Sequence, residues 1–130
     1  MMKIEVLENQ QRFASSFERC LELHQSAIDT TILLLITEID AFIGYALLRK
    51  NIEYNNILIW HFAIDKNYQR RGNGFISLKN IVEKIHAKFP QQDIIISIKH
   101  DNIVMQYLCN KIGFKLLDKN DQEVDYVLKT

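Results

Sequence analysis

A strand, a glycine-containing turn and an amphipathic helix follow one another between residues 55 and 90, and this order strongly constrains the fold. The segment "NNILIWHFAID" (55–65) is apolar at most positions, which is typical of a central strand covered on both faces. Two of the chain's four glycines, Gly72 and Gly74, then stand one residue apart. After them, apolar residues recur at helical spacing as far as Phe89, and Pro90 ends the pattern.

The other apolar runs predict further strands and helices around this unit. An amphipathic helix is expected from Glu8 to about Gln25, and a second one follows the helix-capping pair at 101–102. Gly113 is expected to end that second helix in a left-handed conformation, with Phe114 as its apolar contact. Gly44 is a candidate for a bulge in an antiparallel hairpin. Strands are predicted near 3–7, 30–39, 40–50, 93–100, 114–119 and 124–130. The order β, α, β, β, β, α, β, α, β, β predicts one mixed α/β domain over residues 1–130, with a mostly antiparallel sheet.

Composition excludes several classes of protein. The 130 residues contain 48% hydrophobic and 25% charged residues, which is ordinary for a globular domain. The formal net charge is zero, so no overall basic field indicates nucleic acid. The two cysteines, Cys20 and Cys109, form neither a disulfide framework nor a metal-ligand cluster, and they favour a reduced, cytoplasmic location. No apolar run approaches the ~20 residues of a membrane span.

The glycine turn has the chemistry of a pyrophosphate cradle. Glycines allow successive backbone N–H groups to point into one concavity, and the following helix adds its free N–H groups and its positive dipole end. The Walker pattern is absent, and the dinucleotide pattern fails because Ser77 stands at its third glycine. A third phosphate-binding pattern, Q/R-x-x-G-x-G/A, is satisfied throughout by "QRRGNG" at Gln69–Gly74. A purely structural turn is the alternative.

"QRRGNG" resembles the central motif of the GCN5-related N-acetyltransferases, the GNAT family. The segment "NIVMQYLCNKIGF" (102–114) resembles the family's second signature, an Asn at the head of a helix that ends before Gly-Phe. The resemblance covers nearly the whole chain and is best over residues 42–114. It implies a GNAT-type sheet flanked by helices, with acyl-CoA bound where the central strands splay apart. The implied activity is acetyl transfer from acetyl-CoA to a primary amine, by direct attack in a ternary complex.

The resemblance also implies which residues bind the cofactor. Backbone groups of Phe62, Ala63 and Ile64 would contact the pantetheine arm, and one backbone N–H on this strand would stabilise the oxyanion. Asn102 would contact the lower part of the CoA arm. The pyrophosphate would bind the turn and helix start, namely Gln69, Arg70, Arg71, Gly72, Asn73, Gly74 and Phe75.

The family often protonates the departing thiolate with a tyrosine four residues before the glycine of Gly-Phe. Here that position is Cys109. A thiol, with a reference pKa of ~8.5 against ~10 for tyrosine, has the chemistry to donate a proton. Cys109 also belongs to the apolar stripe of its helix, which favours a structural role. Tyr107 is near in sequence but two residues away, ~200° around a helix. Water is the third candidate.

His61 is the main candidate for the general base, because it lies beside the cofactor strand and titrates near neutrality. By alternation along the strand it is expected to face away from Trp60 and Phe62. A hydrogen-bonded core histidine, or one on the outer sheet face, is the alternative. Glu53 and Glu38 are weaker candidates that would act through water.

The acceptor amine is less constrained by the sequence. The block "IWHFAIDKNYQRRGNG" resembles the corresponding block of bacterial diamine and polyamine acetyltransferases, which mildly favours a small-molecule amine. A protein amine stays open. A GNAT-fold module that binds acyl-CoA without turnover is the alternative function, and a monomer and a homodimer are both compatible with the sequence.

Overall fold

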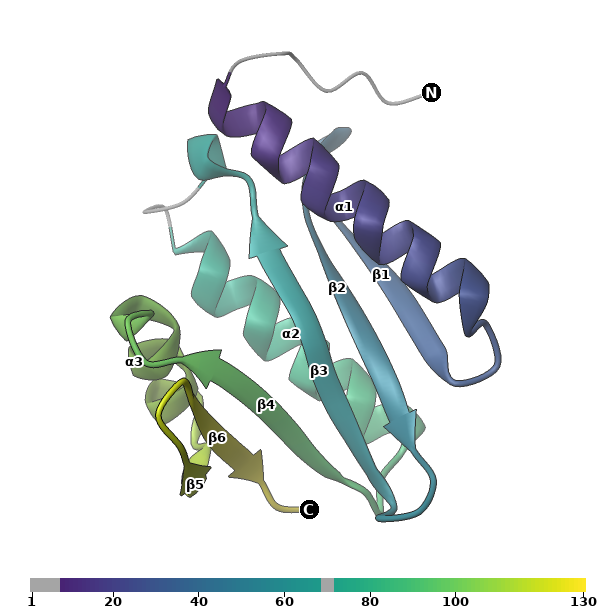
Figure 1. Ribbon diagram of the computed structural model, residues 1–130, viewed down its shortest axis with the longest axis vertical. Helices are drawn as coiled ribbons and strands as arrows, with labels where there is room; N and C mark the ends of the chain where they lie inside the picture. The colour runs from purple at the N-terminus through teal and green to yellow at the C-terminus, as the bar shows by residue number, and fades with distance from the viewer. Residues whose placement is uncertain (1–7, 69–71) are drawn as a thin grey trace.

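The computed structural model describes residues 8–68 and 72–130, and it confirms the predicted mixed α/β fold. One six-stranded sheet, in the order β1-β2-β3-β4-β6-β5, carries helices on both faces (Figure 1). The predicted strand at 3–7 lies outside the described residues. The elements are α1 (Glu8–Ser26), β1 (Thr31–Glu38), β2 (Ala41–Asn51), β3 (Asn56–Ile64), a 3-10 turn (Lys66–Tyr68), α2 (Asn73–Lys88), β4 (Asp93–Lys99), α3 (Ile103–Ile112), β5 (Lys115–Lys119) and β6 (Glu123–Leu128).

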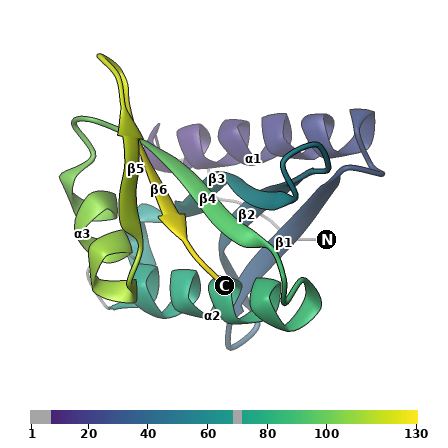
Figure 2. The ribbon, with the colours of Figure 1, turned by 90° about the horizontal axis from the view of Figure 1, so that it is seen from below.

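The helices form a layer on each side of the sheet. Helix α1 covers one face over β1 and β2, and α2 and α3 cover the opposite face (Figure 2). The larger buried cluster lies on the α2–α3 face and includes Leu78, Ile96 and Cys109. A smaller cluster of Cys20, Tyr45 and Leu47 lies on the α1 face. We call the face covered by α2 and α3 the α2 face of the sheet, and the face covered by α1 the α1 face.

The β1–β2 hairpin is antiparallel as predicted, but the bulge is one residue from the expected place. Ile36 pairs with Gly44 and Thr37 pairs with Phe42, so Ile43 is the extra residue. Gly44 has a different role. A Cβ added there would lie 2.5 Å from the carbonyl oxygen of Ala63, because β2 and β3 approach closely at this point. Glycine is therefore needed for close backbone approach.

Strands β3 and β4 are parallel neighbours for only part of their length. Their pairing runs from Asn56↔Asp93 to Ile59↔Ile96, which is four residue pairs, and beyond Ile59 the strands diverge (Figure 1). The other four strand pairs of the sheet are antiparallel. Residues 60–63 of β3 thus have no pairing partner on β4.

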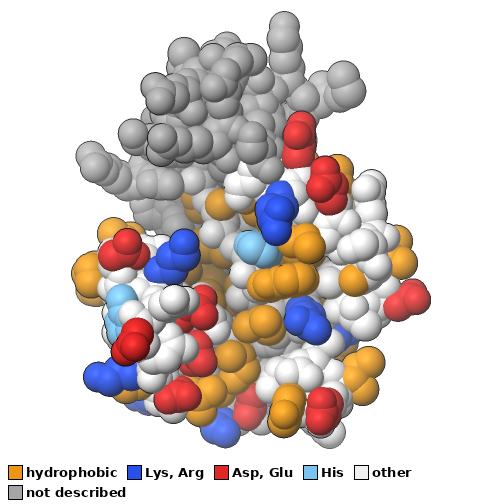
Figure 3. All heavy atoms as spheres, viewed as in Figure 1, with side chains coloured by type: hydrophobic (Ala, Val, Ile, Leu, Met, Phe, Trp, Pro, Cys, Tyr) orange, Lys and Arg blue, Asp and Glu red, His pale blue; other side chains and the backbone are white. Residues whose placement is uncertain are grey.

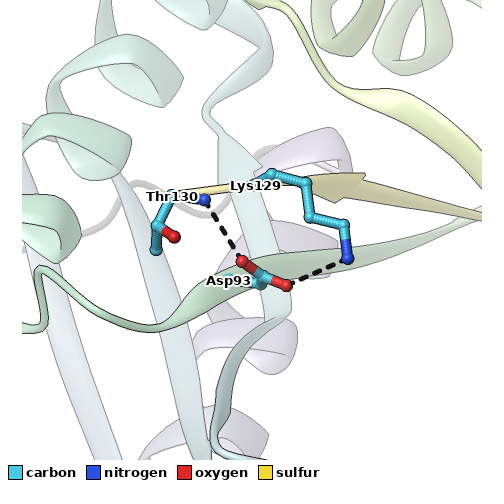
Figure 4. A network of polar contacts seen from close by, with 3 residues as sticks. All are labelled: Asp93, Lys129 and Thr130. Atoms are coloured by element: carbon cyan, nitrogen blue, oxygen red, sulfur yellow. Dashed lines mark hydrogen bonds and ion pairs between the residues drawn. The ribbon is translucent and has the colours of Figure 1, made fainter.

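The paired end of β4 is fastened to the end of β6. The Asp93 carboxylate accepts a hydrogen bond from the Thr130 backbone N–H at 3.2 Å and lies 3.3 Å from Lys129 Nζ (Figure 4). These contacts hold β4 against β6 at the end opposite to the divergence. An exposed ion pair of this kind contributes about 0–1 kcal/mol, so its effect is on local order more than on stability.

Candidate active site

A cleft of about 190 Å³ lies where β3 and β4 diverge. Its walls come from β3 (Ile59 to Phe62), from β4 (Ile96 to Lys99) and from the start of α3 at Asn102 and Met105. The space-filling view in Figure 3 shows a hollow between the surface over β3 and the surface over β4 and β6. Because its walls include residues from both faces of the sheet, a ligand in the cleft can reach from the α2 face to the α1 face.

His61 and Trp60 lie on the same face of the sheet, contrary to the prediction from strand alternation. His61 pairs with Leu47 and Ile59 pairs with Leu48, so Trp60 is an extra residue in a β-bulge. Leu47 is buried under α1, and a cross-strand partner shares its face, so His61 faces the α1 side. The rings of Trp60 and His61 are 5.3 Å apart. The bulge shifts the alternation by one residue, and Phe62 then faces the α2 side.

The surroundings of His61 favour its neutral form. Partial burial lowers its pKa below the ordinary value, and the positive charge of Arg19 on α1 lowers it further. A neutral imidazole at physiological pH can accept a proton, as a general base must. Beside it, the Arg49 guanidinium lies 5.5 Å from the centre of the Trp60 ring. Both arginines therefore keep positive charge on this side of the cleft.

The start of α2 has the features of an anion site in the part that is described. Gly72 is the N-cap with φ = 76°, a left-handed conformation that favours glycine. The cap has no side chain to satisfy the first-turn N–H groups, and Ile76 is the first residue whose N–H reaches the Gly72 carbonyl. The N–H groups of Asn73, Gly74 and Phe75 thus have no acceptor within the helix. The predicted residues Gln69, Arg70 and Arg71 lie outside the described residues.

Gly74 lies where α2 packs against α3. A Cβ at this position would lie 3.2 Å from Leu108 Cδ1 of α3. Only the flexible end of the Leu108 side chain would have to move, so packing alone does not require glycine at this position. The Asn73 side chain donates a hydrogen bond to the Tyr68 carbonyl at 2.8 Å and ties the turn to the helix start.

Asn102 caps α3 as predicted and also lines the cleft. Its side-chain oxygen accepts a hydrogen bond from the Met105 backbone N–H at 3.2 Å. The amide NH₂ of the same side chain is left to donate to a ligand. Phe62, Ala63 and Ile64 continue β3 beside the cleft, past the last residue that pairs with β4. Of these residues, Phe62 and Asn102 line the cleft, and their contact with a cofactor stays a prediction.

Cys109 and Tyr107 face different surroundings on α3. Cys109 is fully buried in the larger cluster, and burial raises the pKa of its thiol to about 12. Tyr107 points outward and is 62% exposed. Neither Cys109 nor Tyr107 is among the residues that line the cleft. The two weaker base candidates also lie outside it: Glu38 is at the end of edge strand β1, and Glu53 is in the β2–β3 turn. The surroundings of Cys109 favour the structural interpretation.

Replacement of Cys109 by alanine is expected to lower stability and leave turnover nearly unchanged. Loss of a buried sulfur in a packed core costs roughly 1–2 kcal/mol. Cys20→Ala is the matched control, since Cys20 is equally buried in the other cluster. Thermal unfolding and kcat, measured on both variants, check this. A kcat loss of about 10²-fold or more in Cys109→Ala alone would assign the thiol an acid role.

Two features of the site are not predicted by the sequence patterns. The bulge at Trp60 depends on how β3 pairs with β2, which no local signal encodes. The second feature is Ser97, which lines the cleft. The run "DIIISIKH" does contain a signal for it, because its serine alternates with the buried isoleucines 94, 96 and 98. No group of three or more His, Cys, Asp or Glu side chains gathers in the described residues. No described helix is long and apolar enough to cross a membrane.

Comparisons with known proteins agree with this architecture. A sequence model of the GNAT acetyltransferase family matches residues 2–114, so the chain belongs to the GNAT acetyltransferases. This membership supports an N-acetyltransferase activity. No curated protein sequence shows a significant match to the chain.

Several solved structures share the fold at low sequence identity. A GNAT acetyltransferase from Elizabethkingia anophelis with acetyl-CoA bound is 19% identical (TM-score 0.71; 84% of this chain and 82% of that chain covered). RimL, a ribosomal alpha-N-protein acetyltransferase in complex with coenzyme A, is 14% identical (0.71; 92% and 72%). A chimera of the spermidine N-acetyltransferase SpeG from Vibrio cholerae and hSSAT is 15% identical (0.70; 85% and 74%). Proteins similar to this chain thus include enzymes named for a polyamine and for a protein.

Proposed function

We propose that this protein transfers an acetyl group from acetyl-CoA to a primary amine, by direct attack while both substrates are bound. One observation carries the proposal: the cleft at the divergence of β3 and β4 has walls on both faces of the sheet. Its α2 side adjoins Asn102 at the start of α3, and its α1 side carries His61. A donor can therefore bind from one side and an acceptor from the other.

The residues present fit a CoA thioester. The first turn of α2, from Asn73 to Phe75, offers N–H groups to the pyrophosphate, and the predicted residues 69–71 would complete this cradle. Asn102 and, as the resemblance implies, the backbone of Phe62, Ala63 and Ile64 would hold the pantetheine arm. Acetyl-CoA supplies a thioester as the acyl donor. The chain supplies orientation, backbone N–H groups to polarise the carbonyl, and the His61 imidazole as general base.

Acetyl-CoA and free CoA are expected to stabilise the protein, and NAD is not. A ligand that binds only the folded state at 100 times its Kd adds about 2.7 kcal/mol to the free energy of unfolding. Thermal unfolding with each ligand measures this. A shift with acetyl-CoA and CoA alone identifies the donor; no shift with either would contradict the proposal at its first step.

A panel of primary amines then tests transfer, with CoA thiol release as the readout. The panel contains spermidine, 1,4-diaminobutane, lysine and a short peptide with a free N-terminus. A small amine or polyamine is the favoured acceptor, because "IWHFAIDKNYQRRGNG" resembles the diamine and polyamine enzymes and acidic side chains lie on the β4–β6 side of the hollow (Figure 3). Faster release with the peptide would favour a protein acceptor.

The second candidate is an acyl-CoA-binding module without turnover. It is favoured by one observation, the replacement of the family's tyrosine by a buried thiol whose pKa is raised to about 12. This candidate predicts stabilisation by acetyl-CoA but no thiol release with any amine of the panel. Water is the proton donor in the catalytic alternative, since the cleft is open to solvent.

A further inference from the structure

Ser97 lies across the cleft from His61 and on the same face of the sheet. Its neighbours Ile96 and Ile98 are buried in the cluster on the α2 face, so Ser97 faces the α1 side by alternation. Ser97 comes directly after Ile96, the last β4 residue that pairs with β3, and both Ser97 and His61 line the cleft. A small molecule between the two strands can therefore contact a hydroxyl from β4 and an imidazole from β3.

The proton of the Ser97 hydroxyl is already committed. Ser97 Oγ donates a hydrogen bond to Asp125 Oδ1 at 2.6 Å, from directly across the β4–β6 ladder. A serine hydroxyl has one proton and two lone pairs, so the lone pairs are what Ser97 can offer to the cleft. A hydrogen bond to a carboxylate also increases electron density on the hydroxyl oxygen. Ser97 is thus set as an acceptor of hydrogen bonds.

Among the side chains that are described, the only ion pair joins Asp93 and Lys129. Asp125 therefore has no cationic partner among them. Its pairing partner on β5 is Asp118, which carries another carboxylate. No ion pair among the described side chains therefore competes with Ser97 for the carboxylate oxygens of Asp125, and these oxygens accept hydrogen bonds. Asp125 holds the Ser97 proton away from the cleft.

We propose that Ser97 accepts a hydrogen bond from the attacking amine, and that Asp125 is the positioning residue that keeps Ser97 from donating to the amine lone pair. The inference rests on the proposed function. A primary amine has two N–H groups, one for Ser97 and one for His61. Its lone pair then stays free for the acyl carbon. A secondary amine has one N–H and cannot satisfy both residues, so the arrangement selects unhindered primary amines.

The balance of the transfer step is complete with these groups. The amine nitrogen forms a bond to the acyl carbon of the thioester, and the carbonyl electron pair moves onto the oxygen; the carbonyl then re-forms as the bond from carbon to sulfur breaks. The nitrogen loses one proton to His61, and the departing thiolate takes one from solvent water. No oxidant or reductant is needed, and Ser97 keeps its proton throughout.

The test compares four variants with the amine of the panel that the wild type turns over fastest and with the N-methyl derivative of that amine. Ser97→Ala is expected to lower kcat/KM for the primary amine by about 10- to 100-fold, the effect of one lost polar contact, and to lower the rate with the N-methyl amine much less. Ser97→Thr keeps a hydroxyl and is expected to restore most of the activity. The kcat/KM of Asp125→Ala for the primary amine is expected to lie between the values of Ser97→Ala and Ser97→Thr.

Asp118→Ala is the matched control. It removes the same charge from the position opposite Asp125, but Asp118 does not contact Ser97 and should leave kcat/KM within about 3-fold. Equal losses in Asp118→Ala and Asp125→Ala would overturn the positioning role and leave only a general charge effect. Wild-type selectivity in Ser97→Ala would overturn the proposal while transfer stands. Stabilisation by acetyl-CoA without turnover of any amine would overturn both the proposal and the transferase function.

Discussion

Replacement of His61 by asparagine is expected to lower kcat by about 10²- to 10⁴-fold, the range for loss of a general base. Asparagine keeps a polar side chain of similar length but cannot take up a proton. The thermal shift with acetyl-CoA should be unchanged, because no side chain of the donor site is altered. CoA thiol release and thermal unfolding, measured on the same preparations, separate the two effects.

His24→Asn is the matched control for this prediction. His24 is also half-buried, but its Nδ1 lies 2.8 Å from Thr31 Oγ1 at the far end of α1, outside the described cleft. Its replacement should change stability only. A wild-type kcat in His61→Asn would remove the imidazole from the mechanism and leave water or another base.

The pH dependence has a definite sign. Burial lowers the pKa of His61, so the imidazole loses its proton at a lower pH than in a free peptide. The acid limb of kcat/KM is therefore expected below the ordinary value of about 6.5, and activity falls as the pH drops through the lowered pKa. Arg19→Gln removes the second cause of the shift, so the limb should move upward. An NMR titration of the imidazole measures the same quantity without turnover.

The largest effect on stability is expected from Gly44→Ala. The new Cβ would lie 2.5 Å from the Ala63 carbonyl oxygen and 2.8 Å from Ile64 Cδ1, so the β3 backbone must shift. Overpacking of this kind costs roughly 1–3 kcal/mol or more. Without the clash, the same change would stabilise the protein by about 0.4–1 kcal/mol, because alanine restricts the unfolded chain. Chemical denaturation of the unliganded protein decides between the two signs.

Gly74→Ala provides the comparison. Its Cβ would meet only the flexible end of Leu108 at 3.2 Å, and alanine is favoured over glycine within a helix. The unliganded variant should therefore be as stable as the wild type or more so. Equal losses in the two variants would show that close backbone approach is not what requires glycine at position 44.

Elements with strong local signals were predictable from sequence. Helix α3 begins after the capping Asn102 and ends at Gly113, whose φ is 121°, and Phe114 is buried beside it. These features depend on neighbours within a few residues, where hydrogen bonding and backbone preference are set by residue type. The mostly antiparallel sheet followed from the order and length of the apolar runs.

The face of His61 was not predictable, because it depends on pairing. Strict alternation would place His61 on the opposite face of the sheet from Trp60, whereas the extra residue in β3 places both on the α1 face. The extra residue of the β1–β2 bulge is Ile43, one position from the predicted Gly44, for the same reason: register depends on both strands, and the sequence of one strand does not determine it. The role of Cys109 shows another limit. Its position matches a family pattern, whereas the surrounding apolar side chains decide how its thiol ionises.

The short parallel ladder between β3 and β4 has a mechanical consequence. It joins a three-strand meander, β1 to β3, to a second unit of β4, β6 and β5, and it supplies only four residue pairs. Beyond these pairs, the two units are held together by the buried cluster on the α2 face, which contains side chains of both units, and by any ligand in the cleft. A ligand bound in the cleft contacts both units and restrains their relative motion. Binding should therefore slow hydrogen exchange at backbone amides of both units together, including amides far from the ligand.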